Sequence, residues 1–301
     1  MAKSTFVKRQ ALTLIVLSLL AIALAALLAI GFVRTAREQE RLEAEHSKHA
    51  ATAPPAGSEG MPDDGRTRGY LRLAEGSGTL FLFGDEAIYG RGLCDVLGNP
   101  LPLVYNCESS FTSLALAELR AEYGAGLRAN VIRDVVKTHT LTYAAEVVAR
   151  LVESGTPPSI ILLSVSDATR AAGLATDPAG YDFAKDLEGA VRSMRLYAPQ
   201  ADILLVIPTN ADADTATAIA AVAGHYGLLT VDLAAALGTD PTLVHGAGED
   251  AGYLTEAGHE AAAAAITEAV GLAVRESYTA PPLPEERLRS EERRVGKECG
   301  L

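Results

Sequence analysis

The stretch 79-TLFLFGDEAIYGRGL-93 decides the fold class. Its apolar run, Leu80 to Phe83, stops at Gly84-Asp85. A short, continuous apolar run that ends in a turn is typical of a buried strand whose carboxyl end meets solvent. In α/β proteins that end of a strand carries ligand-binding and catalytic groups. Glu86, which follows the turn, is therefore the first candidate site residue.

Apolar runs and Ala-rich amphipathic stretches alternate along the rest of the chain. Further strands are expected at 159–167, 201–210 and 228–234, and helices at 110–124, 141–155, 182–199, 215–227 and 255–274. Strands that are apolar throughout are buried on both faces, and β/α alternation favours a parallel sheet between two helical layers. The sequence predicts a doubly wound α/β domain over residues 70–278.

Residues 11–33 contain no charged side chain. At about 1.5 Å per residue a helix over this range spans about 34 Å, which matches a hydrocarbon core of about 30 Å. A cleaved signal peptide is the alternative, but its apolar region usually has only about 7–15 residues. We expect one transmembrane anchor. Basic residues flank both ends of the span, so positive charge alone does not decide its orientation. Because the basic N-terminus, 1–10, is very short and the large domain follows a single span, we expect the domain to be extracytoplasmic.

The segments on either side of the predicted domain lack apolar periodicity. Residues 34–69 are expected to form a charged stalk and a Pro/Gly/Ser-rich linker. Residues 279–301 are strongly charged and are predicted to be disordered. Their last part, 289-RSEERRVGKEC-299, resembles a tail found on unrelated reading frames and indicates a sequencing or assembly artefact.

Composition excludes some classes of function. The net charge of -12 argues against a nucleic-acid partner, because phosphate contacts need clusters of Lys and Arg. Cysteine and histidine spacing does not suggest zinc, and no metal or cofactor is expected. Cys94 and Cys107 either form a disulfide across a small loop or are two unrelated thiols. The oligomeric state is not indicated.

Four segments, in order, resemble the conserved blocks of the SGNH (GDSL-type) esterase and lipase superfamily. They are 81-FLFGDEAIYGRG-92, 124-GAGLRANVIRDVV-136, 159-SIILLSVSDATRAAG-173 and 249-EDAGYLTEAGHEAAA-263. The resemblance covers most of residues 79–275. It implies a flavodoxin-like fold and an ester hydrolase or acyltransferase site at the carboxyl edge of the sheet.

The resemblance also assigns site positions, and most of the signature residues are replaced. The nucleophile position falls on Glu86, the oxyanion-hole Gly on Ala129, the third-block Gly and Asn on Ser164 and Ser166, and the base on Tyr253; Gly84, Asp85, Asp167 and Asp250 are retained. Glu86 has no hydroxyl to acylate, and a Tyr with a pKa near ~10 cannot accept a proton at neutral pH as imidazole does. Losing nucleophile or base costs a serine hydrolase on the order of a million-fold in rate, so Ser-dependent acyl transfer is expected to be absent.

Three alternatives use residues that are present. Ser109, Ser110 or Ser113 could be a displaced nucleophile, although Ser at a helix start is first a capping candidate. His139, His225, His245 and His259 are the available bases, with His259 expected in the last helix and His245 in a loop before Asp250. Glu86, Asp167 and Asp250 could hold a hard cation, or two of them could divide the roles of glycoside hydrolysis.

The sequence therefore favours a membrane-anchored, catalytically degenerate binding or scaffolding module in the cell envelope, with an acylated carbohydrate or lipid as a candidate ligand. An active esterase, O-acyltransferase or deacylase with non-standard residues is the second hypothesis. The third is an interaction protein in which the anchor and stalk matter more than any pocket.

Overall fold

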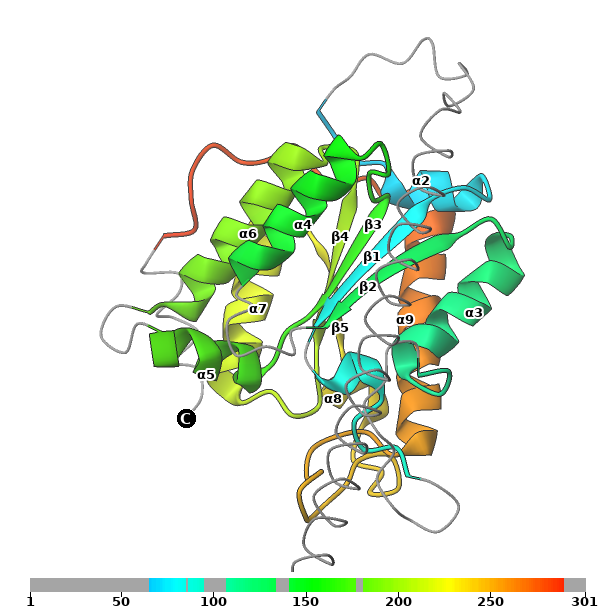
Figure 1. Ribbon diagram of the computed structural model, residues 1–301, viewed down its shortest axis with the longest axis vertical. Helices are drawn as coiled ribbons and strands as arrows, with labels where there is room; N and C mark the ends of the chain where they lie inside the picture. Colours follow the sequence, from blue (N-terminus) through cyan, green and yellow to red (C-terminus); the bar gives the residue numbers. More distant parts are fainter. Residues whose placement is uncertain (1–64, 85, 95–106, 134–140, 177–180, 290–301) are drawn as a thin grey trace, which may run out of the picture. The chain divides into compact units, whose positions relative to one another are not determined.

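The computed structural model describes residues 65–84, 86–94, 107–133, 141–176 and 181–289, and within these five strands form one parallel sheet (Figure 1). The chain divides into two units, Met1–Met61 and Pro62–Leu301, of which the first lies outside the described residues. The strands are β1 (Thr79–Gly84), β2 (Arg128–Arg133), β3 (Ile160–Ser164), β4 (Asp202–Ile207) and β5 (Leu229–Asp232).

The sheet has the order β2-β1-β3-β4-β5, and every neighbouring pair is parallel. This is the flavodoxin-like doubly wound order, in which the chain reverses direction at β1 and β3 and the ligand site lies at their carboxyl ends. The fold class predicted from the sequence is confirmed.

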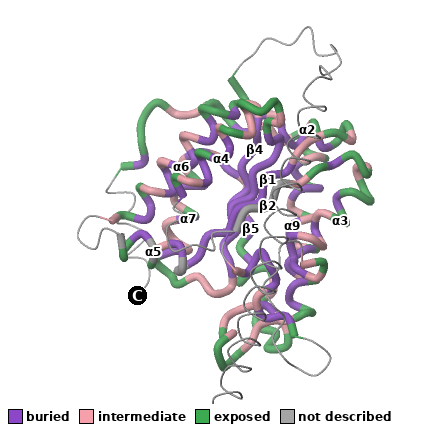
Figure 2. The backbone as a smooth tube through the Cα atoms, viewed as in Figure 1, coloured by how far each residue is buried: buried purple, intermediate pink, exposed green. Residues whose placement is uncertain are grey.

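Helices cover both faces of the sheet because successive strand residues point to opposite sides. Phe81 and Phe83 of β1 pack into one core cluster, with α4 (Leu141–Glu153), α6 (Phe183–Tyr197) and α7 (Ala213–Tyr226). Leu80 and Leu82 pack into the other, with α2 (Gly69–Ala74), α3 (Phe111–Tyr123) and α9 (Glu256–Arg275). Figure 2 shows the result, with the central strands β1, β3 and β4 buried between helices that are exposed on their outer sides.

Among the described residues, five elements were not predicted from the sequence: β2, α2, the 3-10 helix Glu86–Tyr89, α5 (Asp167–Thr176) and α8 (Leu233–Leu237). The strand β2 reads RANVIR and has an Arg at each end, unlike the continuous apolar runs of the central strands. It lies at an edge of the sheet, where charged residues are tolerated because one side has no neighbouring strand.

The folded domain begins before residue 70, the position at which it was predicted to start. Thr67 is buried, its hydroxyl donates to the carboxylate of Asp202, and the amide of Tyr70 donates to the same carboxylate at 2.8 Å. The last residues of the expected linker are therefore part of the fold.

The prediction of a disordered tail is wrong for residues 279–289. Ala280 and Leu288 are buried, and Leu288 donates its amide to the buried carboxylate of Glu188 at 2.6 Å. From α6, Arg192 donates to the Pro284 carbonyl at 2.8 Å, and Arg195 donates to the Pro281 carbonyl. Prolines fix the backbone without periodic structure, so the absence of apolar periodicity did not mean disorder. Residues 290–301 lie outside the described part.

Two further predictions concern a membrane-spanning helix and a disulfide between Cys94 and Cys107. In the part of the chain that the structure describes, no helix is long and apolar enough to cross a membrane; residues 11–33 lie outside that part. Cys94 is exposed and Cys107 is half-buried, and both are free thiols here.

Leu288→Ala should lower the free energy of unfolding by about 2–3 kcal/mol, because it empties a buried site that the surrounding helices cannot refill. Leu196→Ala is the matched control: it removes the same atoms from a side chain that is 69% exposed, and it should change the free energy by less than about 0.5 kcal/mol. Urea unfolding followed by circular dichroism measures both. Equal effects would contradict the packing of residues 279–289 against α6.

Candidate functional site

The site lies at the carboxyl ends of β1 and β3. Glu86 opens a short 3-10 helix, Glu86–Tyr89, two residues after β1 ends at Gly84. A Cβ at Gly84 would lie 2.5 Å from the Ser164 carbonyl oxygen, so only glycine lets the chain turn this close to β3. The turn places the Glu86 side chain, 35% exposed, at the edge of the sheet.

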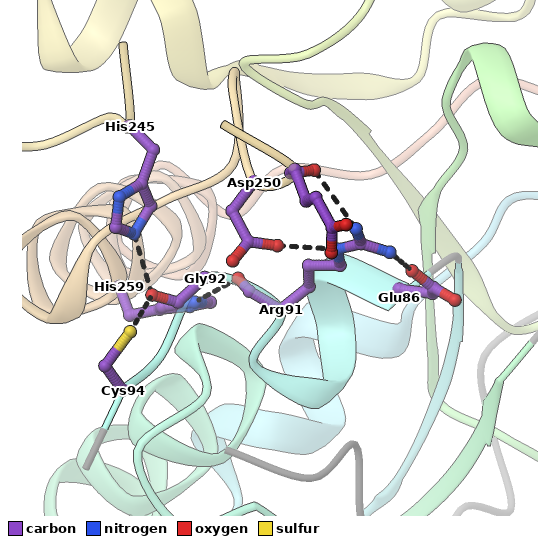
Figure 3. A network of polar contacts seen from close by, with 8 residues as sticks. Glu86, Arg91, Gly92, Cys94, His245, Asp250 and His259 are labelled. Atoms are coloured by element: carbon purple, nitrogen blue, oxygen red, sulfur yellow. Dashed lines mark hydrogen bonds and ion pairs between the residues drawn. The ribbon is translucent and has the colours of Figure 1, made fainter. Parts of the chain in front are cut away.

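Arg91 holds two of the predicted site residues together (Figure 3). Its Nη1 donates to the Glu86 carboxylate, and its Nε donates to Asp250 Oδ1 at 2.8 Å. The remaining Nη2 donates to the Glu249 carbonyl at 3.1 Å. The two carboxylates raise the pKa of the Arg91 guanidinium, which stays charged at all ordinary pH values. Glu86 is thus half of an ion pair.

Tyr253 lies against the same guanidinium. The Arg91 carbon Cζ is 4.9 Å from the centre of the Tyr253 ring, a cation–π distance. Main-chain hydrogen bonds hold the loop that carries Tyr253: His245 N–H donates to the Tyr253 carbonyl at 2.9 Å, and Tyr253 N–H donates to the Asp250 carbonyl at 2.9 Å. The position of the expected base is therefore filled by a ring that stacks on a cation.

The two histidines near the site bind the turn that carries Arg91. His259, fully buried in the first turn of α9, accepts the Phe111 N–H at Nδ1, 3.1 Å away. Its proton is therefore on Nε2, which donates to the Arg91 carbonyl at 3.2 Å. His245 Nε2 lies 2.7 Å from the Gly92 carbonyl and donates to it (Figure 3). Both ring nitrogens of His259 are occupied, so it cannot serve as a general base.

The serines of the third block lie beneath the surface. Ser164 and Ser166 are both fully buried, and the Ser164 hydroxyl has no hydrogen-bond partner among the described residues. Glu86 and Asp250 are partly exposed, so the structure brings these two together at the surface but leaves Ser166 below it. Ser110 caps α3, accepting the Ser113 N–H at 3.4 Å, as a serine at a helix start is expected to do.

The assignment of Ala129 to the oxyanion position is wrong. Ala129 is the second residue of β2 and lies opposite Leu80, whereas Arg133 lies opposite Gly84 at the carboxyl end. Four residues of strand, about 13 Å at about 3.3 Å per residue, separate Ala129 from that edge. The register was misjudged because β2 itself was not predicted. The residues after β2, which include His139, lie outside the described part, as do Asp85 and the side chain of Asp167.

A cation site built on Glu86 and Asp250 does not fit this arrangement. Arg91 already binds both carboxylates, so a metal ion would have to displace a guanidinium. Over the ranges that the structure covers, no group of three His, Cys, Asp or Glu residues could hold a metal. The same ion pairs occupy the carboxylates that glycoside hydrolysis would need.

Arg91 is the functional residue that sequence reasoning missed. The signal was the tripeptide Gly90-Arg91-Gly92, directly after the 3-10 helix. Both glycines have a positive φ, 83° and 93°, and a Cβ at Gly92 would lie 2.2 Å from the Leu254 carbonyl oxygen. Glycines on both sides let a tight turn point a long cationic side chain back over the carboxylate it follows.

The His259→Gln variant tests the buried imidazole through its pH dependence. Burial lowers the pKa of His259 to about 4, against about 6.5 in an unfolded chain. Between these values the unfolded chain binds a proton that the folded protein does not, so stability is present above pH 6.5 and is lost as the pH falls toward 4. The full effect is at most about 3 kcal/mol.

The unfolding free energy of the wild type, measured from pH 7 to pH 4, should therefore fall more steeply than that of His259→Gln. His225→Gln removes a different imidazole and should keep the wild-type slope. Parallel curves for the wild type and His259→Gln would show that His259 is not held neutral.

Comparison with known proteins gives similarity at the level of structure. No family model and no curated protein matches the sequence. Among solved structures, a family 3 carbohydrate esterase from Clostridium thermocellum is 13% identical over 67% of this chain and 98% of that one, with a TM-score of 0.48. A protein described as a GDSL-like lipase from Parabacteroides merdae is 12% identical over 65% and 96%, with a TM-score of 0.47. A lipase/acylhydrolase from Enterococcus faecalis is 14% identical over 69% and 99%, with a TM-score of 0.44. The chain is similar in fold to GDSL-type lipases and esterases.

Proposed function

We propose that this protein is a membrane-anchored binding module of the cell envelope that has an SGNH-hydrolase-like fold but does not hydrolyse esters. The observation that carries the proposal is the Arg91 guanidinium bound to both Glu86 and Asp250. A carboxylate that accepts a charge-assisted hydrogen bond from a guanidinium has its negative charge stabilised, which makes it a poorer nucleophile and a poorer base.

The other parts of a hydrolase site are also occupied. Tyr253 stacks on Arg91, and His259 uses both nitrogens to hold main-chain groups. In serine hydrolases, removal of nucleophile or base costs on the order of a million-fold in rate. A residual oxyanion site would not compensate, since one such donor contributes only about 100- to 1000-fold.

The exposed parts of the same residues suggest how a ligand would bind. Glu86, Arg91 and Asp250 keep 20–35% of their side chains exposed, and they present acceptors and N–H donors beside the Tyr253 ring. Such a surface suits a hydroxyl-rich ligand that stacks on an aromatic ring. An acylated carbohydrate is the ligand class we propose, with a lipid as the alternative.

The test is hydrolysis of a short-chain p-nitrophenyl ester by the full chain purified in detergent, with Glu86→Ala and Glu86→Gln alongside. We expect background rates in all three proteins, together with retention of the wild type on insoluble acetylated polysaccharide. Tyr253→Ala should weaken that retention several-fold, since an aromatic contact contributes about 0.5–1.5 kcal/mol.

Three outcomes would contradict the proposal. Hydrolysis that falls with Glu86→Ala would make Glu86 a working base or nucleophile. Hydrolysis that is unaffected by that change would point to Ser109 or Ser113. The absence of both hydrolysis and retention would favour a protein whose stalk and anchor carry its function.

The anchor is proposed from residues 11–33, which carry no charge over a membrane-spanning length. The full chain should remain in the membrane pellet after alkaline carbonate extraction, and deletion of residues 11–33 should release it. Protease added to intact cells should remove the domain if it is extracytoplasmic. Release of the full chain by carbonate would contradict a spanning segment.

A further inference from the structure

Two thiols lie beside the turn that carries Arg91. The turn is closed by a hydrogen bond from the Leu93 amide to the Gly90 carbonyl at 3.1 Å, and Arg91 N–H donates to the Glu86 carbonyl at 3.2 Å. Cys94 follows the turn directly, and Cys107 returns to it from the far end of the intervening segment.

Cys94 belongs to the polar network of the site. Its Sγ lies 3.9 Å from the Gly92 carbonyl oxygen, the atom that also accepts the His245 Nε2 hydrogen bond (Figure 3). The thiol is exposed, so an oxidant in solution can reach it. A chemical change at the Cys94 thiol would therefore affect the carbonyl of Gly92, the residue that follows Arg91.

Cys107 faces the other end of the same turn. A Cβ built on Gly90 would lie 3.0 Å from Cys107 Sγ, so this sulfur packs directly against the Gly90 backbone. The Cys107 carbonyl accepts the amide of Ser110, the residue that caps α3. Cys107 is therefore held in place by the start of a helix, while the Cys94 thiol makes a long, weak contact with the Gly92 carbonyl.

We propose that Cys94 and Cys107 form a reversible disulfide that ties the Arg91 turn to the start of α3 and so regulates the candidate site. Each thiol loses a proton, the S–S bond forms, and the two electrons reduce the disulfide of a small-molecule oxidant such as oxidised glutathione to two thiols. The Cys94 sulfur then turns from Gly92 toward Cys107. Only the statement that this site binds ligand rests on the proposed function; the disulfide does not.

The placement of the two sulfurs favours this pair. Cys94 Sγ lies 3.9 Å from the Gly92 carbonyl oxygen and Cys107 Sγ packs against Gly90, so both border a single turn. Closing a loop of this length would also stabilise the folded protein against unfolding, because it restricts the unfolded chain.

The first measurement counts thiols in the full chain with Cys299→Ser, so that two cysteines remain. The protein is equilibrated with reduced or oxidised glutathione, its free thiols are alkylated, and its intact mass is recorded. We expect two alkylated thiols in the reduced protein and none in the oxidised one. The oxidised protein should weigh two hydrogen atoms less than the reduced protein before alkylation. A glutathione adduct, a disulfide-linked dimer or two alkylated thiols after oxidation would each overturn the proposal.

The second measurement is hydrogen–deuterium exchange of the peptides that cover 86–94 and 245–255. Oxidation should slow exchange in both, because the turn and the loop are joined by His245 and Arg91. The controls are Cys94→Ser, whose hydroxyl can still donate to the Gly92 carbonyl but cannot form the bridge, and Cys107→Ser. Neither variant should respond to oxidant. A disulfide that forms without altering exchange would show that it does not act on the site, whatever the ester assay shows.

Discussion

The Arg91 guanidinium, bound to Glu86 and Asp250, is the contact on which the site depends. It joins two segments more than 150 residues apart in the sequence: the turn after β1 and the loop before α9. Without it two carboxylates would face each other across the edge of the sheet, with the Coulombic repulsion of like charges. With it one of the two negative charges is neutralised, Tyr253 has a cation to stack on, and hydrogen bonds to Asp250 and Glu249 hold the loop. An isolated surface ion pair contributes little, but a guanidinium shared by two carboxylates, a carbonyl and a ring is a network.

The fold was predictable from the sequence because its main determinant is local. Strands such as Leu80–Phe83 and Ile160–Leu163 are apolar at every position, and only burial on both faces explains that pattern. Four of the helices begin where their N-caps are: Ser110, Asp182, Asp212 and Thr255 each accept a main-chain N–H at a helix start. The edge strand β2 and the proline-rich segment 279–289 were missed for the same reason. Both are stabilised by tertiary contacts that leave no period in the sequence.

The site was predictable only in part. Glu86, Asp250 and Tyr253 lie together because all three contact Arg91, which joins the turn after β1 to the loop before α9. Ala129 was assigned to the wrong end of β2, because the sequence of one strand does not determine its pairing register with its neighbour. Arg91 was missed because its role depends on where a loop from the other end of the chain passes. The sequence shows that Gly90 and Gly92 flank Arg91, but it does not show which residues Arg91 contacts.

These contacts also explain how Glu86 and Tyr253 are accommodated at the edge of the sheet. The carboxylate of Glu86 and the ring of Tyr253 share one partner, the Arg91 guanidinium. The turn after β1 depends on Gly84, because a Cβ at this position would lie 2.5 Å from the Ser164 carbonyl oxygen. The edge of the sheet therefore combines a tight turn after β1 with a guanidinium that binds two carboxylates and an aromatic ring.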